Sequence, residues 1–231
     1  MIRHGQASFG SENYDRLSPV GAVQAEILAD HLLKTGLRFD AVYTGGMERQ
    51  EKTAAALLDA TRRHGLPEPD LIRKDALSEY DSQTVFTHQL PEMVADDPSL
   101  SSYVEQIYSD RKAFQLLFQQ AMTRWASGSF DVPGSPRWKD FRNRVQQGVQ
   151  EIMQRQGPKK RLAVFTSGGP ISVTVQMALD LSDQKAMAVS WQIMNASVTR
   201  FKYKSKDIAL AGFNDVSHLM LQGDRNLMTY R

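Results

Sequence analysis

The sequence predicts an α/β fold, a three-layer α/β/α arrangement in which a mostly parallel sheet lies between two layers of helices. The first observation is an apolar run over residues 39–43, which ends at glycines and precedes a helix-like stretch over 48–64. A second unit of this kind has a buried strand over 161–165, a turn with two glycines, and a helix from 171 to about 181. Because strands and helices alternate along the chain, we expect parallel strands with helices on both faces.

A helix over residues 20–33 is predicted from its start signal and its apolar spacing. Ser18 followed by Pro19 resembles an N-cap with proline at the first helical position. The apolar residues that follow recur at helical spacing, and Gly36 is a stop signal. The other expected elements are a strand over 71–77, helices over 103–125 and 138–156, and strands over 196–203 and 207–213.

A helical insertion over about residues 81–137 is expected to form a lid over the strand ends. The length of 231 residues and the mass of 26.0 kDa fit one large domain over residues 1–231. Residues 78–97 are polar and without a regular period, and a loop with proline and glycine covers 130–137. Residues 214–231 also lack a pattern, so we expect them to be irregular.

Composition and charge exclude several classes of protein. With 28 basic and 26 acidic side chains, the net charge of +2 gives no case for nucleic-acid binding. The absence of cysteine excludes disulfides, thiolate ligands and cysteine nucleophiles, and His31, His64 and His88 lack partners at metal-ligand spacing. No apolar run reaches the roughly 18 residues of a membrane helix, and no room is left for a signal peptide. We therefore expect a cytoplasmic protein with no metal, no cofactor and no membrane partner.

Two loops follow predicted strands or open predicted helices, where free N–H groups bind anions such as phosphate. The turn Thr166-Ser167-Gly168-Gly169 lacks the lysine of a Walker loop and the full dinucleotide fingerprint, so alone it indicates a plain strand-to-helix turn. The segment Arg3-His4-Gly5-Gln6 places a cation beside an imidazole, which suits a phosphate clamp next to a nucleophile. Alone, this segment is also typical of a merely polar terminus.

In combination, these segments resemble the histidine phosphatase superfamily, also called the phosphoglycerate mutase-like family. The match covers most of the chain, in the family's order and at its spacings, but leaves the insertion unmatched. The matching segments are Arg3-His4-Gly5-Gln6, residues 17–25, Val42-Tyr43-Thr44 with Arg49 and Thr53-Ala54, Leu77-Ser78-Glu79, and residues 164–169.

The resemblance implies that His4 is the nucleophile that accepts a phosphoryl group, with Arg3 and Arg49 on the phosphate oxygens. A neutral imidazole can attack phosphorus, and planar guanidinium groups stabilise the charge on the equatorial oxygens without a metal. Glu79 falls where the family keeps an acid that protonates the leaving oxygen and then activates water. Ser167 and the N–H groups of Gly168 and Gly169 are expected to contact the phosphate.

Two departures from the family pattern stand out. Ser167 occupies the position of a second histidine, so a neutral donor replaces a charged one; His218 is a conceivable substitute, although a structural or exposed role is expected for it. The family's first strand is central and directly precedes Arg-His-Gly, whereas only Met1 and Ile2 precede Arg3 here. Either the given start omits several residues, which we favour, or the sheet has an unfilled slot.

The sequence therefore predicts a phosphomonoester hydrolase that acts on a small-molecule phosphate ester through a phosphohistidine on His4. Two alternatives remain open at this point. A mutase would return the phosphoryl group to a second hydroxyl in a site closed to water, and a non-catalytic homologue would bind a phospho-ligand without turnover. Neither the substrate nor the oligomeric state follows from the sequence, because the aromatic residues of the insertion suit a core as well as a pocket.

Overall fold

A six-stranded sheet forms the centre of the molecule in a computed structural model that describes residues 1–8, 14–107 and 109–230. The strand order is β3-β2-β4-β1-β5-β6. Strands β3, β2, β4 and β1 are parallel to one another, while β5 pairs antiparallel with both β1 and β6. The strands are β1 (Ile2–Arg3), β2 (Ala41–Thr44), β3 (Asp70–Arg73), β4 (Leu162–Thr166), β5 (Val198–Lys204) and β6 (Asp207–Asp215). The mostly parallel sheet of an α/β fold is confirmed.

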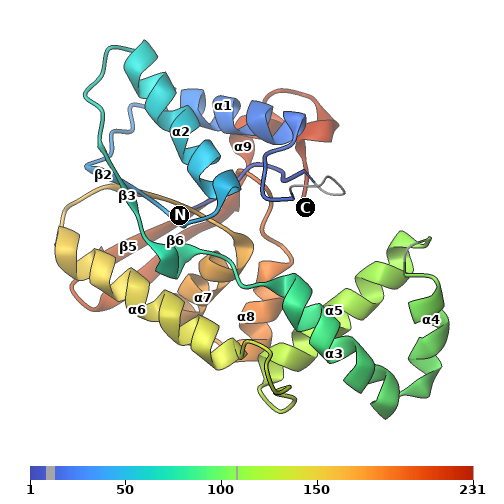
Figure 1. The fold of residues 1–231 in the computed structure, drawn as a ribbon. Helices are drawn as coiled ribbons and strands as arrows, with labels where there is room; N and C mark the ends of the chain where they lie inside the picture. The colour runs from blue at the N-terminus through green and yellow to red at the C-terminus, as the bar shows by residue number, and fades with distance from the viewer. Residues whose placement is uncertain (9–13, 108, 231) are drawn as a thin grey trace.

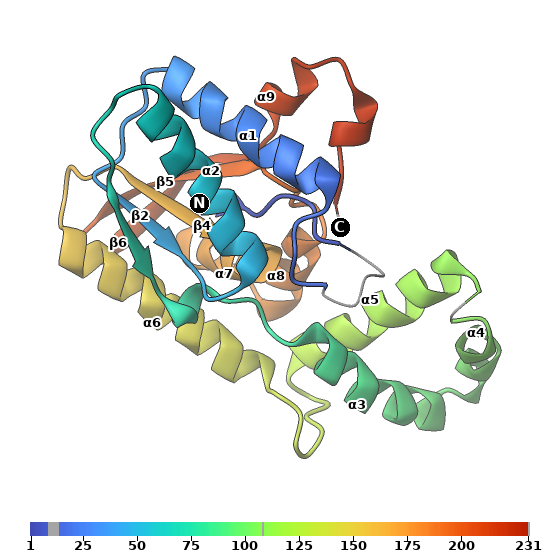
Figure 2. The same cartoon turned by 45° about the horizontal axis from the view of Figure 1, so that its top comes forward.

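Helices cover both faces of this sheet, as Figures 1 and 2 show. Adjacent residues of β2 point to opposite faces: Val42 packs in one hydrophobic core with α1 and α2, and Tyr43 packs in the other with α6 and α7. This alternation follows from the period of two along a strand. The helices are α1 (Pro19–Lys34), α2 (Glu48–Arg63), α6 (Trp138–Gln156), α7 (Gly168–Leu179), α8 (Asp183–Ser190) and α9 (Ser217–Met220). No helix among the described residues is both long and apolar enough to cross a membrane.

Strand β1 fills its place in the sheet with two residues. Ile2 lies opposite Phe165 of β4 on one side and Val198 of β5 on the other, and Arg3 lies opposite Thr166. The predicted alternative of an unfilled slot is wrong, because both neighbouring strands find a partner here.

The insertion is helical, but its elements differ from the prediction. Helix α3 (Ser82–Asp96) occupies much of the stretch that was expected to be irregular, and the single helix expected over 103–125 is two helices, α4 (Ser101–Glu105) and α5 (Arg111–Ser127). Residue 108 lies outside the described residues. In α3 only Val85, Gln89 and Met93 are buried, at intervals of four. Because only one residue per turn is buried, the apolar period of α3 is weak, and the sequence pattern does not predict this helix.

Smaller differences concern two other segments. The strand expected over 71–77 is the short edge strand β3 followed by a 3-10 helix (Asp75–Leu77). The C-terminal segment, expected to be irregular from residue 214, contains α9 and a 3-10 helix (Arg225–Leu227), which pack against α1. Both segments lack long apolar runs, and their tertiary contacts determine their structure.

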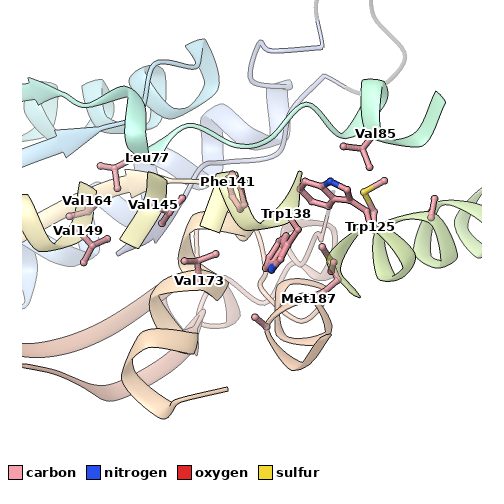
Figure 3. Close-up of a cluster of buried hydrophobic side chains, with 14 of the residues drawn as sticks. Leu77, Val85, Trp125, Trp138, Phe141, Val145, Val149, Val164, Val173 and Met187 are labelled. Atoms are coloured by element: carbon pink, nitrogen blue, oxygen red, sulfur yellow. The ribbon is translucent and has the colours of Figure 1, made fainter. Parts of the chain in front are cut away.

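The insertion projects from the body of the molecule and is joined to it by aromatic packing. Figure 2 shows α3, α4 and α5 extending to one side of the sheet and its helices. At the junction, the Trp125 ring of α5 contacts the Trp138 ring of α6 edge-on at 5.3 Å (Figure 3). The Trp125 ring also lies 4.6 Å from the Tyr80 ring. Trp125 and Trp138 are therefore core residues, and the role of the insertion as a lid stays a prediction.

Candidate active site

The candidate site lies where three strands of the sheet end. His4 follows β1, Gly45 follows β2 and Ser167 follows β4. These ends are in register, because the His4 amide donates to the Thr166 carbonyl at 2.9 Å and the Gly45 amide donates to the Phe165 carbonyl at 3.2 Å. The carboxyl edge of a parallel sheet is where α/β proteins bind their ligands.

The His4 imidazole is buried and held in one tautomer. Its Nδ1 lies 2.6 Å from the Gly5 carbonyl oxygen, which only accepts, so Nδ1 carries the hydrogen. Its Nε2 lies 3.0 Å from Arg49 Nε, which only donates, so Nε2 keeps its lone pair. Burial lowers the pKa of His4 well below its usual value, and the charges of Arg49 and Arg3 lower it further. The result is a neutral imidazole with a nucleophilic nitrogen facing a guanidinium group.

Close backbone packing holds the loop that carries His4 against the first turn of α1. A Cβ on Gly21 would lie 2.1 Å from the Gln6 carbonyl oxygen, and one on Gly5 would lie 2.3 Å from the Gly21 carbonyl oxygen. The Gly5 amide donates to Thr53 Oγ1 of α2 at 3.1 Å. Three segments that carried the resemblance thus pack together, and only glycine fits at their contact.

The Arg49 guanidinium is buried and makes an ion pair that no motif of the sequence predicts. Its Nη1 lies 2.6 Å from Asp15 Oδ1, and its Nη2 lies 3.1 Å from Met47 Sδ. The other Asp15 oxygen accepts the Glu48 amide at 2.8 Å. The Asp15 carboxylate thus accepts hydrogen bonds from a helix N-terminus and from a guanidinium group, which are two kinds of donor that bind anions. The second predicted clamp, Arg3, donates from Nη1 to the Ile193 carbonyl.

Glu79 lies at the N-terminus of α7. Its Oε2 accepts the Gly169 amide at 2.9 Å and its Oε1 accepts the Tyr80 amide at 3.2 Å. Burial raises the pKa of Glu79, while the Gly169 amide and the charges of Arg49 and Arg3 oppose that rise. The charges of Arg49 and Arg3 therefore lower the pKa of both His4 and Glu79. The expectation that the Gly169 N–H contacts phosphate needs correction, because Glu79 accepts that hydrogen.

Ser167 is buried at the N-cap of α7, directly before Gly168, the first residue of that helix. Its Oγ accepts a hydrogen bond from Gln50 Nε2 at 2.7 Å. Gln50 is the neighbour of Arg49 on α2, and no motif of the sequence points to it. The structure thus brings His4, Arg49, Glu79 and Ser167 together from four segments of the chain.

His218 lies away from this group. It is buried on α9, where its ring packs 5.6 Å from the ring of His31 on α1. Burial lowers the pKa of His218 to about 4, so it is neutral at physiological pH and cannot replace an imidazolium. Among residues 1–8, 14–107 and 109–230, no group of three or more His, Cys, Asp or Glu side chains is placed to hold a metal ion.

Comparison with known sequences gives matches of two kinds. The chain is 26% identical over 188 residues to a 2,3-bisphosphoglycerate-dependent phosphoglycerate mutase of Brucella ovis, covering 78% of this chain and 80% of that protein. A mutase of the same name from Bartonella bacilliformis is 32% identical over 87 residues, which are 35% of this chain and only 41% of the relative.

Solved structures with the same fold include phosphatases and a mutase. Phosphoserine phosphatase of Entamoeba histolytica superposes with a TM-score of 0.62 at 18% identity, over 94% of this chain and 96% of that one. A mycobacterial glucosyl-3-phosphoglycerate phosphatase superposes with a TM-score of 0.60 at 20% identity, over 93% of this chain and 97% of that one. Phosphoglycerate mutase of Bacillus anthracis superposes with a TM-score of 0.61 at 16% identity, over 96% of this chain and 95% of that one.

The sequence profile of the histidine phosphatase superfamily (branch 1) matches residues 1–102 and 105–216. These ranges contain His4, Arg49, Glu79 and Ser167, and they span nearly all of the chain. The chain belongs to the histidine phosphatase superfamily.

Proposed function

We propose that this protein hydrolyses a small-molecule phosphate monoester through a phosphohistidine formed on His4 Nε2. One observation carries the proposal: the Gly5 carbonyl holds the hydrogen on Nδ1, so the lone pair of Nε2 faces the buried guanidinium of Arg49 at 3.0 Å. A nucleophile and a cation for the phosphoryl oxygens thus lie side by side.

In the first step, Nε2 attacks phosphorus and the bond from phosphorus to the leaving oxygen breaks. Glu79, whose raised pKa favours the carboxylic acid, gives its proton to that oxygen. In the second step, the Glu79 carboxylate takes a proton from water, the hydroxyl oxygen bonds to phosphorus, and the P–N bond breaks. Phosphate leaves, and His4 and Glu79 return to their starting states. Arg49 must turn its Nε–H from Nε2 to the phosphoryl group as the P–N bond forms.

Phosphoryl transfer of the mutase type is the second candidate, because the curated relatives are named phosphoglycerate mutases. Both reactions share the first step and differ in what accepts the phosphoryl group, which is water in one and a hydroxyl group in the other. A homologue that binds phosphate without turnover would form no phosphohistidine at all.

Labelling of His4 tests the three possibilities. The protein is mixed with a labelled phosphate ester and quenched in base, in which phosphohistidine is stable, and both protein-bound label and released phosphate are measured. A hydrolase gives both, a mutase gives label with little phosphate, and a binding protein gives neither. The matched control for His4→Ala is His64→Ala, because His64 is exposed on the same domain. Turnover of an aryl phosphate by His4→Ala at the parent rate would contradict the proposal.

A further inference from the structure

Two neighbouring residues in the first turn of α2 reach two neighbouring strand ends. Arg49 contacts His4 after β1, and Gln50 contacts Ser167 after β4. The Gln50 and Ser167 side chains are both buried, with residue exposures of 0% and 1%. Burial of an amide and a hydroxyl is costly unless they are paired, and a bond of 2.7 Å between Gln50 Nε2 and Ser167 Oγ pairs them.

The surroundings of Gln50 determine which way its amide points. Its Nε2 also lies 3.4 Å from the Leu77 carbonyl oxygen, which can only accept. Its Oε1 lies 3.4 Å from the Met47 amide nitrogen, which can only donate. Both contacts are long, but they agree on the same orientation, with the nitrogen toward Ser167. Ser167 Oγ is therefore the acceptor in its bond with Gln50.

This arrangement leaves the hydroxyl hydrogen of Ser167 available. Among the described parts of the chain, no group accepts a hydrogen bond from Ser167 Oγ. The residue lies at the end of β4, next to His4 at the end of β1, where the proposed function places the phosphoryl group. The hydrogen can be donated to an oxygen that arrives there.

We propose that Gln50 is a positioning residue that makes Ser167 a hydrogen-bond donor to the phosphoryl oxygen. The proposal rests on the proposed function and adds a residue to its site. The pair presents one amide and one hydroxyl at the position where the resemblance implies a second histidine. It follows that Ser167→His alone is expected to bring an imidazole against the Gln50 carboxamide.

Binding of orthovanadate, measured by calorimetry without turnover, tests the assignment. Gln50→Met keeps the length of the side chain and removes the donor. We therefore expect vanadate to bind roughly 3- to 10-fold more weakly, which is the usual effect of losing one hydrogen bond. In a Ser167→Ala background the same change is expected to have no further effect. Gln50→Glu is expected to bind most weakly, because its carboxylate accepts the Ser167 hydrogen.

The outcomes separate the two proposals. An equal loss from Gln50→Met in the parent and in the Ser167→Ala background would overturn the assignment, because Gln50 would then act through packing alone. A thermal unfolding midpoint is recorded for each variant, and Gln147→Met on the exposed side of α6 is the control for a neutral glutamine replacement. A parent protein that binds vanadate but never carries phosphohistidine would overturn the hydrolase and leave the role of Gln50 standing.

Discussion

At the scale of single residues, burial moves the pKa values of His4, the proposed nucleophile, and Glu79, the proposed acid, in opposite directions. The pKa of His4 lies below its usual value because of burial and two guanidinium groups, and the pKa of Glu79 lies above its usual value because of burial. Attack needs neutral His4, so kcat/KM rises as the pH rises through the pKa of His4. Leaving-group protonation needs Glu79 as the acid, so kcat/KM falls above the pKa of Glu79. We therefore expect a bell-shaped pH profile of kcat/KM, with its acidic limb set by His4 and its alkaline limb by Glu79.

Glu79→Gln tests this assignment. The variant cannot donate a proton to the leaving oxygen, so kcat/KM for an alkyl phosphate is expected to fall about 10²- to 10⁴-fold and the alkaline limb of its pH profile to disappear. The loss for 4-nitrophenyl phosphate is expected to be smaller, because nitrophenolate leaves without a proton. Persistence of the alkaline limb in the variant would assign that limb to another group.

Asp15→Asn tests the ion pair with Arg49. Because the carboxylate lies on Arg49 Nη1 and on the Glu48 amide, it competes with an incoming phosphate for both. Removing the charge while keeping the shape is expected to tighten inorganic phosphate binding roughly 3- to 10-fold, in line with about 1 kcal/mol for a partly exposed pair. Asp59→Asn, in the exposed pair with Arg62, is the control. Weaker phosphate binding by Asp15→Asn would show instead that Asp15 orients Arg49.

At the scale of elements, the contact between the His4 loop and α1 depends on Gly21. An alanine in a helix usually stabilises it by about 1 kcal/mol relative to glycine, but here the new Cβ would lie 2.1 Å from the Gln6 carbonyl. We expect Gly21→Ala to lower the free energy of unfolding by about 1–3 kcal/mol, as overpacking does, and to lower kcat/KM through displacement of His4. Urea denaturation and steady-state kinetics measure the two effects, with exposed Ala22→Ser as the control. A stabilised, fully active variant would show that the loop is not held there.

The elements also show what could be predicted from the sequence. Strands β2 and β4 with their following helices were predictable, because buried apolar runs bounded by glycine have few other structures. Helix α3 was not, since its buried stripe is one residue wide. In the site, His4, Arg49 and Glu79 were found through the family pattern. Asp15 and Gln50 were missed because their partners lie 34 and 117 positions away, and no local spacing reveals such pairs.

At the scale of the whole molecule, the insertion and the sheet domain share one core. The Trp125 side chain of α5 is buried against Trp138 and Tyr80, and its Nε1 donates to the Pro136 carbonyl at 2.5 Å. Trp125→Ala is expected to lower the free energy of unfolding by about 3–5 kcal/mol. Tyr103→Ala, at an exposed position of α4, is the control and is expected to change it by less than about 0.5 kcal/mol.

Unfolding of the parent protein also shows whether the insertion unfolds together with the sheet and its helices. Because the aromatic junction is continuous with the core beneath the sheet, circular dichroism and tryptophan fluorescence are expected to report one coincident transition in the parent. Two separate transitions would show that the insertion is an independent folding unit.

The contacts of the N-terminal segment with the C-terminal part of the chain have a consequence during synthesis, because the N-terminal segment is made first. Arg3 donates to a carbonyl 190 positions later, Asn195 donates to the His4 carbonyl from 191 positions away, and Gln24 meets Leu227 across 203 positions. At a synthesis rate of roughly 5–20 residues per second, such a gap lasts roughly 10–40 s. During that time the nascent chain carries His4, the proposed nucleophile, without the contacts made by the C-terminal part of the chain. On the proposed function, a chain truncated before Asn195 is therefore expected to show no turnover of a phosphate ester.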